Sequence, residues 1–122
     1  AVAEKIVRTA GKPHHIELVS NRNELTADGK DLAYVTVKVV DKDGNLCPTD
    51  SRLIHFSVKG AGKFRAVANG DPTNLEQFHL PKMHAFHGML TAIVQAGEIA
   101  GDLVLTAKAS GVKTGTVHLQ AK

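Results

Sequence analysis

Three histidines, His79, His84 and His87, lie within nine positions of one another and are the residues whose type most suggests chemistry. Neutral imidazole is a common ligand of Zn²⁺, so three rings could converge on one ion. Their spacing matches no helical or zinc-ribbon motif, and the sequence fixes no cysteine or carboxylate ligand beside them. We therefore expect surface loop residues, with no metal and no cofactor; a zinc titration that releases no heat would confirm this.

A second group of oxygen-bearing side chains, Asn69, Asp71 and Glu76, could offer ligands to Ca²⁺, which prefers carboxylate and carbonyl oxygens. The same string also has the composition of a turn. Gly70 tolerates positive φ, Asp71 can accept hydrogen bonds from backbone amides ahead of it, and Pro72 fixes the direction in which the chain leaves. We predict a rigid structural turn without a cation, in which replacing Asp71 by Ala lowers stability or docking and leaves metal affinity unchanged.

The single cysteine, Cys47, cannot form an internal disulfide and lies beside Pro48 in an expected turn. A reactive thiol needs a helix N-terminus or a cationic neighbour to lower its pKa, and the adjoining sequence supplies neither. We interpret Cys47 as an incidental turn residue without a catalytic role.

The charge pattern argues against several partners. The net charge is +3, but Lys and Arg occur singly among Asp and Glu, without the clustered cations and stacking aromatics of a nucleic-acid-binding surface. No apolar run reaches membrane-spanning length, and no signal peptide is present. The chain begins with Ala1, so we expect a piece of a longer polypeptide that binds no nucleic acid and spans no membrane.

The secondary-structure pattern is clearest in the segment from Ala33 to Asn45. Apolar residues alternate with polar ones up to Val39, and an Asp-Lys-Asp-Gly-Asn string follows at 41–45. This pattern predicts a half-buried strand that enters a hairpin. Tyr34 falls on the face opposite the valines.

The same alternation recurs along most of the chain. It predicts further strands at 14–20, 54–58, 64–68, 90–94, 103–107 and 117–119. The region from Asn69 to His87 shows no sustained period and exceeds ordinary loop lengths, which indicates a functional segment or a docking surface.

No helical period appears, and 122 residues suffice for one domain. The predicted fold is therefore all-β: an immunoglobulin-like antiparallel β-sandwich of roughly seven to nine strands, without a disulfide. We expect residues 1–12 to be a linker or an edge strand from a preceding domain, and residues 13–122 to form the sandwich.

Several segments resemble bacterial immunoglobulin-like domains. They are 16–18, 25–32, 35–45 and 54–60. A more selective combination is the Asn-Gly-Asp-Pro-Thr string at 69–73, followed by Glu-Gln-Phe at 76–78 and by Ala85 to Leu90. This combination resembles the C-terminal immunoglobulin-like domain of bacterial family 2 glycoside hydrolases, the β-galactosidase group. The resemblance extends roughly from Thr9 to Leu119.

The resemblance implies a noncatalytic role for this chain. In that family the catalytic acid and nucleophile are glutamates of a separate TIM-barrel domain, so the partners implied are that barrel and other sandwich domains of the same polypeptide. The implied location is secreted, periplasmic or at the cell surface. The residues we expect to dock are Asn69, Gly70, Asp71, Pro72, Thr73, Glu76 and Phe78.

The glutamates of the chain itself give no sign of catalysis. A retaining glycosidase holds two carboxyl groups about 5–5.5 Å apart. Here they are dispersed over turns and outward strand positions: Glu4, Glu17, Glu24, Glu76 and Glu98. We predict solvated carboxylates and no hydrolysis by this chain.

Two alternatives from other functional classes stay open at this level: a carbohydrate-binding module and an adhesin-type immunoglobulin-like repeat of a surface protein. Sugar sites usually present an aromatic platform. The chain has no Trp, so a glycan contact would fall to Tyr34, or to a patch formed by Phe78 and Phe86. The sequence alone fixes neither the sugar and linkage of the parent enzyme nor any contact with substrate, and it leaves the oligomeric state open.

Overall fold

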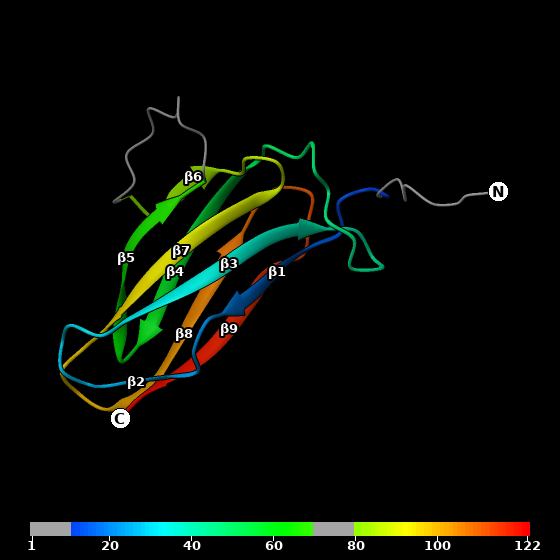
Figure 1. Cartoon of the computed structure of the whole chain (residues 1–122). Helices are drawn as coiled ribbons and strands as arrows, with labels where there is room; N and C mark the ends of the chain where they lie inside the picture. Colours follow the sequence, from blue (N-terminus) through cyan, green and yellow to red (C-terminus); the bar gives the residue numbers. More distant parts are fainter. Residues whose placement is uncertain (1–10, 70–79) are drawn as a thin grey trace.

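The computed structural model describes residues 11–69 and 80–122. These residues form strands and no helix, so they contain no helix that is long and apolar enough to cross a membrane (Figure 1). The strands are β1 (His15–Ser20), β2 (Glu24–Leu25), β3 (Leu32–Val40), β4 (Leu53–Gly60), β5 (Gly62–Ala68), β6 (Lys82–His84), β7 (Met89–Ala96), β8 (Gly101–Lys108) and β9 (Gly115–Ala121).

The strands form two sheets with the order β1-β3-β7-β5 and β2-β9-β8-β4-β6. All pairs are antiparallel except β2 with β9. Constant-type immunoglobulin domains pair strands A-B-E-D in one sheet and G-F-C in the other. The first sheet and the β9-β8-β4 part of the second reproduce this order, while β2 and β6 extend the second sheet at its edges. The predicted immunoglobulin-like sandwich is therefore confirmed.

The core lies between the two sheets and is mainly aliphatic. The alternating residues of β3 from Ala33 to Val39 are fully buried, as the sequence pattern predicts. Ile54, Leu103 and Leu105 from the other sheet are equally inaccessible. Burying one such side chain contributes roughly 1.5–3 kcal/mol, which explains how the core holds without a disulfide.

The first strand joins the two sheets along one side. β1 pairs with β3 over its whole length, and the backbone N–H of Ile16 also donates to the carbonyl of Lys113, just before β9 (3.1 Å). This approach requires Gly115, because a Cβ there would lie 2.3 Å from the carbonyl oxygen of Ile16. One side of the sandwich is thereby closed by backbone contact.

The turn at 41–45 is confirmed, and the hairpin that the sequence predicts there is short. The chain returns for only one bridge, between Val40 and Leu46, and the next strand, β4, pairs with β6 and β8 in the opposite sheet. Pro48 lacks the N–H that would continue the ladder, and the Cys47 side chain turns into the core. The chain therefore crosses from one sheet to the other at this point.

A short strand also lies within the region where the sequence shows no period. β6 has three residues, of which only Met83 is buried. Alternation cannot be recognised over so short a segment, so this strand was not predicted.

Candidate functional site

The expected docking string is represented in the described residues by Asn69 alone. Its side-chain Nδ2 donates to the carbonyl of His84 (2.9 Å), which ties the end of β5 to β6. The other expected docking residues lie outside the described residues: Gly70, Asp71, Pro72, Thr73, Glu76 and Phe78. Their docking role stays a prediction.

A groove of about 490 Å³ lies beside Asn69. It is lined by Ala68, Asn69, Phe86, His87, Met89, Leu90 and Thr91. The Phe86 and His87 rings lie 4.1 Å apart between centroids, and His87 adopts a positive φ of 53°. Behind them Gly88 packs so tightly that a Cβ would lie 2.3 Å from the Cys47 carbonyl oxygen. The wall of the groove is therefore held in place by backbone packing.

Two of the three histidines singled out in the sequence lie among the described residues. His84 lies on β6 and His87 on the exposed turn before β7, whereas His79 falls outside the described residues. Within 11–69 and 80–122, no three His, Cys, Asp or Glu side chains gather closely enough to hold a metal ion. The expectation about all three histidines stays a prediction.

A buried carboxylate, Asp41, marks the point where the chain enters the sandwich. Its side chain is 4% exposed and accepts hydrogen bonds from the backbone N–H groups of Gly11, Asp43 and Asn45, each 2.9 Å. The Asn45 side-chain amide adds a fourth (3.3 Å). Because these donors favour the ionised form, and the Gly11 N–H most of all, they lower the pKa of Asp41 from 3.8 to about 2.

The junction at Asp41 borders a cavity of about 550 Å³. Its lining comes from the entering chain and the turn, namely Gly11, Lys12, Pro13, His14, Asp41, Lys42, Asp43 and Asn45. The bond from the His14 N–H to the Val40 carbonyl (2.8 Å) continues the attachment into β1. Sequence reasoning identified the turn and missed the anchor. An Asp at the start of such a turn commonly caps its amides, but no local signal points to Gly11.

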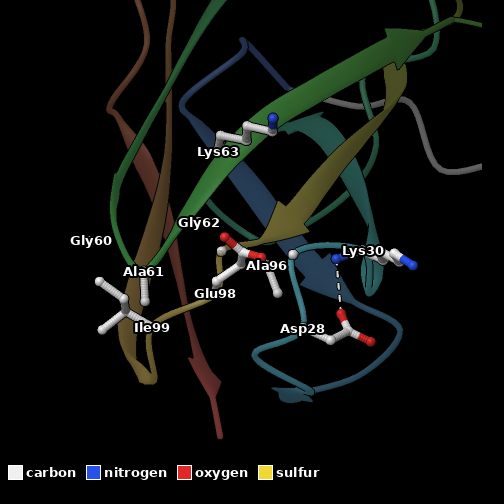
Figure 2. Close-up of a pocket in the computed structure, with 11 residues that line it drawn as sticks. Asp28, Lys30, Gly60, Ala61, Gly62, Lys63, Ala96, Glu98 and Ile99 are labelled. Atoms are coloured by element: carbon white, nitrogen blue, oxygen red, sulfur yellow. Dashed lines mark hydrogen bonds between the residues drawn. The ribbon is translucent and has the colours of Figure 1, made fainter.

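The opposite end of the sandwich holds a cavity of about 460 Å³, shown in Figure 2. Three loops surround it, at 28–30, 60–63 and 96–99. Backbone bonds fix them to one another, including Gly29 N–H to the Gly97 carbonyl (3.1 Å) and Gly97 N–H to the Ala61 carbonyl (2.8 Å). No aromatic ring lines the cavity, so it provides no platform on which a sugar could stack. Ile99 belongs to the lining and is 80% exposed, so the cavity is open to solvent on this side.

Tyr34 lies where the alternation places it, on the outer face of the four-stranded sheet. It pairs with Ile93 of β7 and is 46% exposed, so the prediction that it points away from the valines is confirmed. The Tyr34 backbone N–H donates to Oδ1 of Asn21 (2.9 Å), which helps to end β1.

Cys47 belongs to the core more than to the surface of its turn. The side chain is 5% exposed, and burial, with the nearby Asp41 and Asp50 carboxylates, raises the pKa of the thiol. A thiol that stays protonated is a poor nucleophile. Burial thus gives a physical reason for the interpretation that Cys47 has no catalytic role, which stays a prediction.

Comparison with known proteins gives concordant matches. A family described as "Glycoside hydrolase family 2 C-terminal domain 5" matches residues 16–118. The β-galactosidase BoGH2A of Bacteroides ovatus is 43% identical over 121 residues, which cover 99% of this chain and 14% of that protein. A β-glucuronidase of Formosa agariphila is 29% identical over 116 residues, covering 93% of this chain and 12% of that protein.

A solved structure supports the same relationship. A family 2 glycosyl hydrolase from Bacteroides cellulosilyticus superimposes with a TM-score of 0.90 and 30% identity, covering 93% of this chain and 15% of that chain. This chain therefore corresponds to about one seventh of the length of the curated β-galactosidase it matches.

Proposed function

Because the chain belongs to the glycoside hydrolase family 2 C-terminal domain 5 family, we propose that it is the noncatalytic accessory domain of a β-galactosidase-like enzyme. Its work is positional: a rigid sandwich that braces the catalytic TIM barrel and the other sandwich domains of the same polypeptide. The observation that carries this proposal is the match over nearly the whole chain to only 14% of a β-galactosidase.

The electrostatics of the described carboxylates agree with this role. A general acid in glycoside hydrolysis needs a raised pKa. The pKa of Asp31 is instead lowered, chiefly by the hydrogen bond from the Thr26 N–H and also by Arg22, and the pKa of Asp41 is lowered by the turn amides. Both shifts come from bonds that hold loops in place, which is the use of charge expected of a scaffold.

The experiment that tests the proposal is the mass of the native polypeptide recognised by an antibody against this chain, with a galactosidase assay on the immunoprecipitate. We expect a much larger and active polypeptide, whereas the isolated chain turns over no aryl galactoside. A free polypeptide of the size of this chain, or a large inactive one, would overturn the proposal.

Two finer proposals concern the sugar and the location. We propose a β-galactoside as the parent's substrate, since the β-galactosidase relative is 43% identical and the β-glucuronidase relative 29%. We also propose a secreted, periplasmic or cell-surface enzyme, which rests on the family alone. Cell fractionation with the same antibody tests the location, and comparing aryl galactoside with aryl glucuronide tests the sugar.

A glycan contact at Tyr34 is the second candidate function, and the observation in its favour is that this ring is 46% exposed. A carbohydrate-binding module would retain galacto-oligosaccharides after separation from the parent and lose them in Tyr34→Ala. Calorimetry on the chain and on this variant separates the two functions.

A further inference from the structure

The outer face of the four-stranded sheet carries a row of side chains without charge. The register brings Tyr34 of β3 beside Ile93 of β7, and Thr36 beside Thr91. Extending both rows to β1 and β5 gives seven outward side chains, here called the neutral band: Val19, Tyr34, Thr36, Ala66, Ala68, Thr91 and Ile93. Val19 is 53% exposed and Tyr34 46%, so the band reaches solvent.

Charged residues border the neutral band at both ends of the sheet, and the exposed Arg65 lies beside it in the bulge between Phe64 and Ala66 of β5. Glu17 and Lys38 are paired across β1 and β3 beyond one end, and Lys63 pairs with Gln95 beyond the other. A surface with an uncharged centre and a polar rim has the composition of a protein interface. The charged side chains therefore lie around the neutral band.

The outer face is large enough for a contact between domains. With strands about 4.8 Å apart and about 3.4 Å per residue, the two rows of the neutral band on four strands cover roughly 20 Å by 14 Å, or on the order of 300 Å². Contacts between domains of one chain bury about 600–1,500 Å² in total, counted over both partners. One side of such a contact thus matches this face.

The attachment of the chain indicates what covers the face. Gly11 is bonded to Asp41 at the end of β3, one of the two central strands under the neutral band, and Figure 1 shows the chain reaching the sandwich at this end. A domain on the N-terminal side is therefore tethered next to this sheet. Tethering raises its effective concentration at the band, so even a modest apolar contact stays occupied.

We propose that the neutral band is the docking face for the domain that precedes this one in the same polypeptide. The inference rests on the proposed function, which supplies the preceding domain. The facing surface is uncharged and apolar, with acceptors for the hydroxyl groups of Thr36 and Thr91.

The test compares two cysteine variants in the complete polypeptide. Thr36→Cys lies in the band, and Thr106→Cys is the matched control. Thr106 is an outward threonine of the other sheet, and its strand, like β3, has a neighbouring strand on each side. Both are labelled with a maleimide under native conditions and read by mass spectrometry of the tryptic peptide. We expect Thr36→Cys to react at least about tenfold more slowly, which equals about 1.4 kcal/mol of protection.

Three results decide the inference. Equal labelling of the two variants in a large, active glycosidase overturns the docking face and leaves the proposed function intact. Protection that disappears when the polypeptide is diluted to a monomer overturns the proposed domain contact, and means that a second copy of the polypeptide covers the band. Protection that persists in the monomer supports the docking face if it also depends on the band. In a Thr91→Cys variant, adding Thr36→Glu should then abolish the protection, and adding Thr106→Glu should not.

Discussion

The outer faces of the two sheets differ, although their inner faces are alike. On the five-stranded sheet charge or imidazole reaches most outward rows, as where His55 lies beside Lys108 and Lys82, and where Asp102 lies beside Gln120. One outward row of that sheet, Ser57, Thr106 and Thr116, is uncharged. On the four-stranded sheet the paired residues of two adjacent rows carry none, and the exposed Arg65 lies beside them in the bulge of β5. Water satisfies the first face, whereas Tyr34 and Val19 on the second expose apolar surface.

The two sides of a strand are under different constraints. The inward residues must fill one shared core and so are apolar in both sheets. The outward residues are free of that requirement and reflect what lies outside. The composition of the neutral band therefore reflects what packs against the sheet from outside, whereas the composition of the core does not.

The largest expected effect tests the inner faces that the sheets share. Leu105→Ala removes a fully buried side chain and leaves a cavity, so we expect a loss of about 2–5 kcal/mol in the free energy of unfolding. The adjacent outward change Thr106→Ala should stay within about 0.5 kcal/mol. Urea unfolding of the purified chain measures both, and comparable losses would show that inward and outward positions are not distinct.

A smaller effect is expected where β1 joins the two sheets. Gly115→Ala places a methyl group against the Ile16 carbonyl, so β1 and β9 must separate locally, at a cost of about 1–3 kcal/mol. Thr116→Ala, the exposed neighbour, serves as the control. Hydrogen exchange of the Ile16 amide should increase in Gly115→Ala; unchanged protection would mean that the joining contact contributes nothing.

The Asp41 junction belongs to the four-stranded sheet, and its loss should appear as a change in pH dependence. Since folding lowers the pKa of Asp41 from 3.8 to about 2, its contribution is complete above the unfolded value and disappears as the pH falls between these values. Asp41→Ala should therefore unfold at a lower temperature at neutral pH, and the difference from the unaltered chain should shrink toward pH 2.

Thermal unfolding monitored by circular dichroism across this pH range checks the prediction. Asp43→Ala, an exposed carboxylate of the same turn, is the control and should keep the pH dependence of the unaltered chain. Asp31 also has a lowered pKa, so Asp41→Ala should reduce the acid sensitivity without abolishing it. An equal difference at neutral and acidic pH would contradict the anchoring role.

The smallest effect concerns the outer faces of the chain in isolation. Thr36→Glu and Thr106→Glu both point away from the core, so each should change the free energy of unfolding by about 0.5 kcal/mol or less. The two variants should then differ only in the complete polypeptide. A large loss for Thr36→Glu in the isolated chain would mean that the band is tuned for the stability of the sheet and not for a partner.

Sequence reasoning succeeded where the constraint is local. The alternation from Ala33 to Val39 reports burial directly, because successive strand residues point to opposite faces. It missed what is distant or too short: no local signal shows that the hairpin after β3 ends at a single bridge, and three-residue β6 has no readable period. Most of the expected docking string at 69–78 lies outside the described residues, so the choice of that string stays a prediction.

The sequence by itself determined the all-β sandwich, the inward valines and the outward Tyr34, since strand periodicity is a property of consecutive residues. It also carried the resemblance to the family, through the segments at 69–73, 76–78 and 85–90. Only the tertiary structure decided that Gly11 is fastened by Asp41, thirty positions away, and that β1 closes against Lys113. Only the register of four strands gathered the neutral band. These features depend on which segments, distant in the sequence, become neighbours in space. The packing of the shared core determines those neighbours.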